Sequence, residues 1–424
     1  MRTLAYKDRE EMEKLIHRSG VDFEQVLDAV NPIISDVRSR GDAALIEYTK
    51  KFDKYDLTAS NMRVSQEEIK KAYGKVDPSF VKALRHAQRN IGKFHEEQLK
   101  TIKKSWKTET DEGVEITEKV RPIESCGAYI PGGRANYPST VLMTCSVART
   151  AGVERIVVVS PPPITDEVVV ACDMCAVDEI YRIGGAQAIA ALAYGTQTIK
   201  KVDKIVGPGN KYVTCAKLLV FGKVDIDMPA GPSEVLVIAD EKANPVFIAA
   251  DILAQAEHDP DAQSILVTDS KDLAEKVARK VEEQAASLKR REIIMKSLEH
   301  SYTVLVENMD EAVLFANRYA PEHLEIITGN ASKISEKIKN AGTVFIGEYA
   351  PVPAGDYASG ENHVLPTGGA ARFASALGVR DFLRSYSIQK ISRKGLENLA
   401  ETIETLAEAE SLDAHSMAVK KRFG

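Results

Sequence analysis

The chain has 424 residues, of which 44% are hydrophobic and 28% are charged, the composition of an ordinary globular protein with two or three domains. Its formal net charge is −6, and no basic stripe with interleaved aromatic residues is present, so nucleic-acid binding is not expected. No apolar run is long enough for a membrane span, and the charged N-terminus, MRTLAYKDREEMEKLIHRSG, lacks the apolar region of a signal peptide.

The first part of the chain is predicted to be mostly helical. Residues 4–20 have the pattern of a short amphipathic helix, and residues 23–51 and 78–104 have the pattern of longer helices. Residues 105–120 alternate in polarity around a central Asp-Glu-Gly turn, which predicts a β-hairpin.

From about residue 127 onward, apolar strand candidates alternate with helical stretches. The predicted strands are 154–160, 178–185, 202–207, 233–240, 263–269, 302–308, 323–328 and 342–347. Strands of nearly continuous Val and Ile, separated by helices, are typical of parallel sheets that are covered on both faces. The number of units indicates two sheets, hence two α/β lobes, followed by a charged helical tail over residues 385–424. Because ligands of open α/β sheets bind beyond the carboxyl ends of the strands, the chemistry is expected in the loops that follow them.

All five cysteines are predicted to be buried, unreactive thiols. They are Cys126, Cys145, Cys172, Cys175 and Cys215. An odd number in a long chain without a signal peptide indicates a reducing compartment, and we therefore expect the cytoplasm. The CxxC spacing of Cys172 and Cys175 falls within a helical run, and no second pair completes a zinc site.

Three glycine-rich turns each lie between a strand candidate and a helix candidate. They are YIPGG at 129–133, GGAQ at 184–187 and GPGN at 207–210. Glycine lets backbone amides approach a ligand, and a helix N-terminus favours a phosphate group. None of the three has the GxGxxG fingerprint of dinucleotide binding. Nucleotide binding and ordinary turn formation therefore both remain open at this point.

Four of the eight histidines lie beside other polar groups in a way that suggests a site. Gln255 and His258 share one face of a predicted helix, although a polar helix end gives the same pattern. The other groups are Glu322 with His323 at the start of a strand, Asp356 with Asn362 and His363 in a long Gly/Pro-rich loop, and Glu410 with His415 in the tail. Ligands of this kind suit Zn²⁺, Mn²⁺ or Co²⁺, but sequence spacing alone does not assemble them. The remaining four, His17, His86, His95 and His300, fall in charged helical stretches and need no function.

Seven segments, taken together, resemble the L-histidinol dehydrogenase family. They are CGAYIPGG, YRIGGAQAIAALAYGT, VDKIVGPGNKYV, DMPAGPSEVLVIAD, ILAQAEHDP, YAPEHLEI and GDYASGENHVLPTGGAARFASALGV. They follow the family's order from about residue 120 to the C-terminus, whereas the N-terminal hundred residues resemble the family only in their helical character. The resemblance implies NAD-dependent oxidation of L-histidinol, through L-histidinal, to L-histidine in the last two steps of histidine biosynthesis, with one zinc ion per subunit.

The resemblance also implies roles for particular residues. The implied zinc ligands, which also lie against the substrate, are Gln255, His258, Asp356 and His415. The implied NAD contacts are Tyr129, Gln187 and Asn210. Further implied substrate contacts are Ser233, His323, His363 and Glu410, and the paired general bases are Glu322 and His323. Glu361 takes a place that is often smaller or uncharged in the family, which can alter the local charge but not the ligand set.

We expect four parts in the chain. They are a helical segment over residues 1–23, a first α/β lobe from 24–126 and 235–380 with the zinc and catalytic residues, a second α/β lobe over 127–234 with the NAD contacts, and a helical tail over 381–424. Both sheets are expected to be mostly parallel and to be incomplete versions of the Rossmann sheet. The resemblance further implies a homodimer in which each tail reaches the neighbour's active site.

These residue types suit the implied reaction. Zinc has no redox chemistry, so its expected role is to hold the amine and imidazole of histidinol. A histidine such as His323 suits removal of the alcohol proton as hydride leaves, and Glu322 can activate the water that adds to the aldehyde. Because neighbouring residues on a strand face opposite sides, both can serve one site only if the strand begins after Glu322.

Three rival functions use some of the same features. A zinc-dependent hydrolase would need the same ligands but not three glycine loops at strand ends, and NAD binding would separate the two. A two-lobed solute-binding protein fits the fold class but normally carries an export signal. A thiol mechanism like that of aldehyde dehydrogenases needs a reactive cysteine, and no local pattern supports one.

Overall fold

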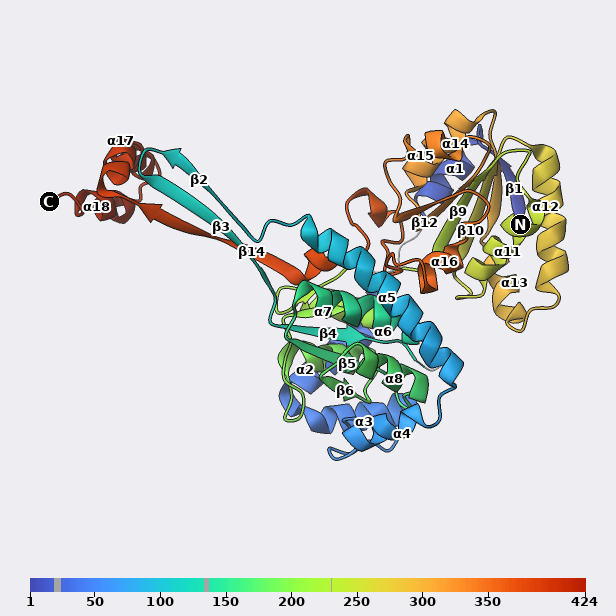
Figure 1. Ribbon diagram of the computed structural model, residues 1–424, viewed down its shortest axis with the longest axis horizontal. Coiled ribbons are helices and arrows are strands. Elements are labelled where there is room, and N and C mark those ends of the chain that lie inside the picture. Colours follow the sequence, from blue (N-terminus) through green and yellow to red (C-terminus); the bar gives the residue numbers. More distant parts are fainter. Residues whose placement is uncertain (19–23, 133–136, 230) are drawn as a thin grey trace.

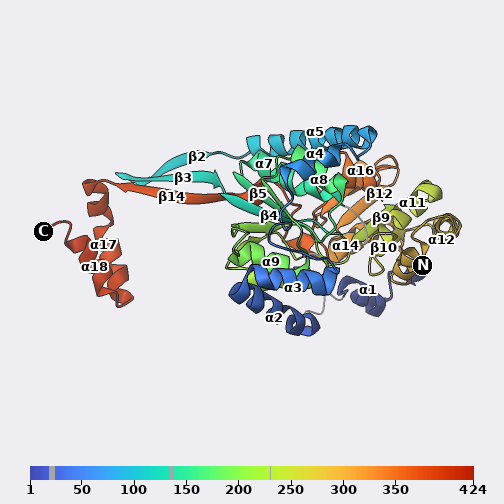
Figure 2. The same cartoon turned by 90° about the horizontal axis from the view of Figure 1, so that it is seen from below.

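The protein is described by a computed structural model that covers residues 1–18, 24–132, 137–229 and 231–424. Figure 1 shows two α/β lobes and a long arm that leads away from one of them, and Figure 2 shows the same arm from below. The N-terminus lies in the first lobe and the C-terminus at the tip of the arm. The expected class of two α/β lobes with parallel sheets is confirmed. Among the described residues, no helix combines the length and apolarity that a membrane crossing requires.

The first lobe is built on a six-stranded sheet whose strands are all parallel. In spatial order they are β1 (Arg2–Ala5), β11 (Tyr302–Leu305), β10 (Gln263–Thr268), β9 (Glu234–Ala239), β12 (His323–Ile327) and β13 (Thr343–Ile346). One face is covered by α1 (Arg9–Ile16), α14 (Met309–Tyr319) and α15 (Ala331–Ser335). The other is covered by α11 (Pro245–Ala256), α12 (Lys271–Ala285), α13 (Arg291–Glu299) and α16 (Val352–Tyr357). Burial on both faces explains the apolar runs in the central strands.

The second lobe is built on a five-stranded parallel sheet. In spatial order its strands are β6 (Glu179–Tyr181), β5 (Arg155–Val159), β4 (Ser125–Tyr129), β7 (Lys204–Val206) and β8 (Asp225–Ile226). One face packs against α4 (Gln66–Tyr73), α5 (Pro78–Lys100), α6 (Pro138–Val141), the π-helix η1 (Leu142–Ser146), α7 (Val147–Ala151) and α8 (Asp166–Met174). The other packs against α2 (Glu24–Arg40), α3 (Asp42–Asp53), α9 (Gly185–Tyr194) and α10 (Lys211–Val220).

The structure places the N-terminal third of the chain differently from our expectation. Helices α2 to α5 do not join residues 235–380 in the first lobe; they pack on the sheet of the second lobe. The reason is their apolar faces: Val30 and Val37 of α2, for example, share a core with Val157 of β5 and Ile189 of α9. Nor is the segment 1–23 purely helical, because β1 forms an edge of the first sheet beside β11.

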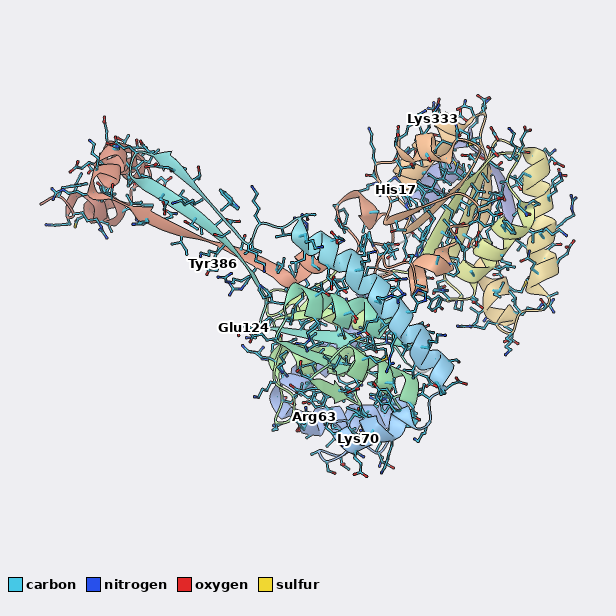
Figure 3. All side chains as sticks on the ribbon, in the orientation of Figure 1. His17, Arg63, Lys70, Glu124, Lys333 and Tyr386 are labelled. Carbon is cyan, nitrogen blue, oxygen red and sulfur yellow. The ribbon has the colours of Figure 1, made fainter. Side chains whose placement is uncertain are left out.

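The arm is a three-stranded antiparallel sheet that ends in two helices. Its strands are β2 (Ser105–Asp111), β3 (Val114–Pro122) and β14 (Leu383–Ile391), and its tip holds α17 (Arg393–Ala409) and α18 (Asp413–Lys420). The hairpin predicted over residues 105–120 is confirmed. The segment 381–424 is not all helix, however, because it begins in the 3-10 helix η3 (Val379–Phe382) and continues into β14. Figure 3 marks Glu124, where the arm joins the second lobe, and Tyr386 on β14.

Candidate active site

The polar residues predicted in the first lobe gather at the amino ends of β9 and β12. Glu322 and His323 stand at the start of β12, and Ser233 directly precedes β9. Gln255 lies in the last turn of α11, whereas His258, predicted on the same helix, lies in the turn just beyond its end at Ala256. This corrects our expectation that the chemistry of this lobe lies beyond the carboxyl ends of its strands. The reason is the way the lobes meet: His363 of the first lobe contacts Thr140 of α6, which follows the carboxyl end of β4 in the second lobe.

The two candidate bases are buried side by side. His323 Nδ1 lies 2.9 Å from the backbone oxygen of Glu234 and 3.6 Å from Glu322 Oε2. Glu322 Oε2 accepts a hydrogen bond of 2.7 Å from the backbone N–H of Glu234. Burial lowers the pKa of His323 to about 4 and raises the pKa of Glu322 well above its usual range. Glu322 precedes the strand, as the sequence predicted, so both side chains can face one site.

One of the four predicted metal ligands, Asp356, lies close to His323, and two others, Gln255 and His258, lie at the end of α11 in the same lobe. Asp356, at the end of α16, has its Oδ1 3.8 Å from His323 Nε2, and burial raises the pKa of the Asp356 carboxyl to about 7. The Gln255 side chain is buried, and neither atom of its amide has a hydrogen-bond partner. His258 is exposed as a residue, yet partial loss of hydration of its imidazole lowers its pKa. A positive charge on His258 would lower the pKa of both His323 and His363, which is consistent with three imidazoles in the same region.

The donor set can hold a metal only in combination. Across the residues that the structure describes, no three or more His, Cys, Asp or Glu side chains are arranged as a metal site by themselves. The predicted set of one carboxamide, one imidazole and one carboxylate has only two side chains of these types, because Gln255 contributes an amide. The unpartnered amide of Gln255 nevertheless fits a ligand, since a buried polar side chain normally has a partner.

The loop that carries His363 is anchored to the second lobe. His363 Nδ1 lies 2.9 Å from the backbone oxygen of Asp356, and its Nε2 lies 3.3 Å from Thr140 Oγ1. Next to it, the buried Asn362 donates a 2.7 Å hydrogen bond to the backbone oxygen of Met143, within the π-helix η1. Burial lowers the pKa of His363 to about 4, so its ring is neutral near pH 7.

The three predicted NAD contacts lie at the carboxyl ends of strands in the second lobe. Tyr129 ends β4, Gln187 lies in the first turn of α9 after β6, and Asn210 is the N-cap of α10 after β7. The Tyr129 hydroxyl accepts a 3.2 Å hydrogen bond from the backbone N–H of Gly185, which joins two of the loops. Gln187 is buried and its Oε1 has no partner. Gly133, the end of the first glycine loop, lies outside the described residues.

Close packing explains why glycine is needed in these loops. Gly207 has a φ of +108°, and a Cβ there would lie 2.3 Å from the backbone oxygen of Tyr129. A Cβ at Gly184 would lie 2.4 Å from the ring of Pro161. The loops after β4, β6 and β7 are therefore shaped for close approach of the backbone at one edge of the sheet.

The remaining predicted residues are not near this site within one chain. Glu410 and His415 are exposed on the helices at the tip of the arm, far from both lobes in Figures 1 and 2. Glu361, by contrast, lies close to the site. Its carboxyl accepts a hydrogen bond from Thr343 Oγ1, and burial raises its pKa to about 7.

The cysteines do not form a reactive centre. All five are free and buried, and burial raises the pKa of every thiol above its usual value. A nucleophilic thiolate is therefore disfavoured at each of them.

Sequence reasoning overlooked two contributors to this site. Glu234 holds both candidate bases through its backbone, and Thr140 contacts His363 from the other lobe. Glu234 could have been noticed in the sequence, because a charged residue is unusual at the start of a buried strand, and the same observation singled out Glu322 and His323. Thr140 carried none.

Comparison with known proteins gives a consistent result. The model of the family described as histidinol dehydrogenase matches residues 16–423. The chain is 52% identical to a histidinol dehydrogenase of Methanothermobacter thermautotrophicus, over 98% of each chain. It is 49% identical to that of Methanocaldococcus jannaschii, over 98% of this chain and 96% of the relative. The crystal structure of histidinol dehydrogenase from Elizabethkingia anophelis matches it with a TM-score of 0.93 at 42% identity, covering 100% of this chain and 98% of that one.

Proposed function

The chain belongs to the histidinol dehydrogenase family, and from this premise we propose that it oxidises L-histidinol to L-histidine in two successive steps, with NAD⁺ and a zinc ion at the site. The membership makes it an oxidoreductase of histidine biosynthesis. The observation that carries the proposal is the buried cluster of Glu322, His323 and Asp356, in the lobe that also carries Gln255 and His258. This lobe contacts the second lobe, which carries the glycine loops, through His363 and Thr140. A zinc-dependent hydrolase gives no reason for those loops.

The donor set fits a zinc ion. Gln255, His258 and Asp356 offer one oxygen or nitrogen atom each, and the buried amide of Gln255 lacks any other partner. When bound, Zn²⁺ supplies a Lewis acid that orients the amine and imidazole of the substrate, and NAD⁺ supplies the hydride acceptor. For NAD⁺, the fit rests on the close-packed turns at Gly184 and Gly207 and on the unpartnered Oε1 of Gln187.

His323 is arranged to accept a proton. A backbone oxygen can only accept a hydrogen bond, so the contact of Nδ1 with the oxygen of Glu234 fixes the proton of the neutral ring on Nδ1. The lone pair of Nε2 is then free, and the buried Nε2 has no hydrogen-bond partner. With its pKa lowered to about 4, the ring is neutral near pH 7 and can take the proton of the histidinol alcohol.

Glu322 is placed for the second step. Its carboxyl shares the same buried corner, and burial raises its pKa, so it holds a proton more readily than a free carboxyl. We assign to it the activation of the water that adds to histidinal. His363, Ser233 and the ligand residues would line the substrate, with His363 held by Thr140 and by the backbone of Asp356.

The fourth ligand must come from a second copy of the chain. His415 is exposed at the tip of an arm that points away from its own lobes, together with Glu410 and the exposed apolar side chains of Leu406, Leu412 and Met417. A two-helix tip with so much apolar surface must dock on something, and a two-fold dimer offers the partner's lobe. We therefore propose a homodimer in which each tip completes the neighbour's site. The five buried free thiols suit a cytoplasmic enzyme.

The yield of NADH per histidinol tests the proposal directly. A purified, zinc-loaded enzyme given limiting L-histidinol and excess NAD⁺ should form two NADH for each histidinol and release histidine. One NADH per histidinol, with histidinal as the product, would contradict the two-step oxidation. No NADH at all, in protein that binds zinc, would contradict the dehydrogenase assignment.

A further inference from the structure

Glu234, the first residue of β9, holds both candidate bases through its own backbone. Its N–H donates to Glu322 Oε2 at 2.7 Å, and its carbonyl oxygen lies 2.9 Å from His323 Nδ1. The orientation of both bases therefore depends on where this one residue sits. Its side chain is buried as well, and a buried carboxylate is costly unless it is paired and hydrogen-bonded.

The partner of that carboxylate is Arg18, from the N-terminal segment. Its guanidinium meets the Glu234 carboxylate with two groups: Nη2 donates to Oε2 at 2.7 Å, and Nε donates to Oε1. Arg18 also donates from Nη1 to the backbone oxygen of Tyr319 at 2.9 Å and lies over the Tyr319 ring, 3.5 Å from its centroid. A further contact of 3.4 Å reaches the backbone oxygen of Ile16. The side chain of Arg18 is only 10% exposed, so this ion pair is shielded from water.

We propose that Arg18 is a positioning residue for the two bases, acting through Glu234. The proposal rests on the proposed function, because it assumes that Glu322 and His323 carry the proton transfers. Without Arg18, the Glu234 carboxylate is left buried beside the Tyr319 ring and close to the Glu322 carboxyl, with no cation to offset it. The start of β9 then relaxes away from its position, and the N–H and carbonyl that hold the two bases move with it.

A positioning role for Arg18 differs from general structural support because it should affect kcat more than the KM for histidinol. The polar contacts of Arg18 run to Glu234, Tyr319 and Ile16. Most of the proposed substrate contacts lie elsewhere, at the end of α11, on α16 and in the loop of His363, and only Ser233 adjoins Glu234. Misplacing a base by about 1 Å costs up to roughly a hundredfold in rate. Loss of Arg18 should therefore lower kcat far more than it raises the KM for histidinol.

Four variants and one control test this inference. Arg18→Met should lower kcat by about 10- to 100-fold and change the KM for histidinol by less than about threefold. Arg18→Lys keeps the charge and should recover part of the loss. Arg18→Met combined with Glu234→Gln removes both charges and should recover more of kcat than Arg18→Met alone, whereas Glu234→Gln alone leaves Arg18 unpaired and should be impaired. The control is Arg318→Met, on α14 next to Tyr319. It removes an exposed ion pair with Glu13 and should keep the wild-type rate.

The outcomes separate this inference from the proposed function. If the wild type forms no NADH from histidinol, the proposed function fails, whatever the variants do. If the wild type is active and a folded Arg18→Met enzyme keeps its kcat, Arg18 has no positioning role. The same conclusion follows if the variant with both Arg18→Met and Glu234→Gln (the doubly neutral variant) has no higher kcat than Arg18→Met alone. It also follows if Arg18→Met changes kcat and the KM for histidinol by the same factor. Should Arg18→Met not fold, Arg18→Lys and the doubly neutral variant decide by the same split between kcat and KM.

Discussion

Replacing Lys217 by Met would remove half of a buried ion pair that lies under the glycine loop after β7. Lys217 Nζ contacts Asp227 Oδ1 and donates a 3.0 Å hydrogen bond to the carbonyl oxygen of Gly207. Asp227 Oδ2 accepts a 2.7 Å hydrogen bond from the N–H of the same glycine. The two side chains are only 3% and 2% exposed. The pair therefore holds both polar groups of the Gly207 backbone, in a loop that we assign to NAD.

The expected loss of stability is large. Removing one partner of a buried ion pair costs about 3–5 kcal/mol, because the other charge stays behind without compensation. Burial already raises the pKa of Asp227, and Lys217 opposes that rise. Without Lys217, the folded-state pKa rises further above the unfolded value, so the variant is least impaired at acidic pH, where the carboxyl is neutral. Its stability falls as the pH increases through the raised pKa.

Urea unfolding of the wild type and Lys217→Met at about pH 5 and about pH 8 measures both effects. Calorimetric titration with NAD⁺ should also show weaker binding, since the Gly207 carbonyl loses its donor. The control is Lys276→Met, which removes an exposed pair with Asp272 on α12 and should cost at most about 1 kcal/mol. If Lys217→Met loses no more than this control, or if its deficit does not grow with pH, the reasoning is refuted. If the affinity for NAD⁺ is unchanged, the Lys217–Asp227 ion pair does not support NAD binding through the Gly207 loop.

Three further predictions follow from the site. His258→Asn should lower the bound zinc and the activity together while the fold is retained, as metal analysis and circular dichroism would show. In the wild type, zinc affinity should fall as the pH is lowered from about 8 to about 6. The reason is that burial raises the pKa of Asp356 to about 7, and a zinc ligand must be deprotonated. His323→Ala should lose roughly 10²–10⁴-fold in turnover, while Glu322→Gln should impair oxidation of supplied histidinal more than the alcohol step; equal losses in both half-reactions would contradict this division. A mixture of His323→Ala and His415→Ala chains should regain roughly a quarter of the wild-type activity through heterodimers with one intact site, and verified heterodimers without activity would exclude shared sites.

Most strands that are buried on both faces were predictable, because such burial requires a nearly continuous run of apolar residues. From β5 to β13, the runs of Val and Ile matched the observed strands, with most boundaries within one or two residues, apart from the two-residue β8. Strand β14 was missed because it lies in the exposed arm, so its residues show no alternation between a buried and a solvent face. Strand β1 has only four residues at a sheet edge, too few to give a period. The packing of α2 to α5 was also missed, since an amphipathic helix does not say which sheet its apolar face meets.

The roles of the candidate site residues stay predictions, and the way these residues assemble was not predictable from the sequence. Family-like motifs pointed to Gln255, His258, Glu322 and His323, yet nothing in their spacing indicated that they meet at the amino ends of the strands. The contacts that orient them run through backbone atoms, as at Glu234, and a backbone N–H or carbonyl has no signature in a sequence. His95 is a second example. It falls in a charged helical stretch of the sequence but is fully buried, with Nδ1 2.8 Å from the backbone oxygen of Ile91.

The position of the site at the amino ends of the first sheet has a physical consequence for the whole molecule. An α/β lobe of this kind usually supplies its own ligand loops at the carboxyl ends of its strands, which is where the second lobe has its glycine-rich loops. The first lobe instead presents buried side chains, which need a second surface to complete an enclosure. Two contacts supply it: Thr140 approaches His363, and the Met143 carbonyl accepts from Asn362. The proposed hydride transfer requires the reacting carbon and the nicotinamide to be in contact. A site between the lobes fits this requirement, because the proposal assigns the bases to one lobe and the NAD contacts to the glycine loops of the other. In the proposed homodimer, the arm would have its role here, because a site that opens between two lobes can receive a further ligand from the partner's arm.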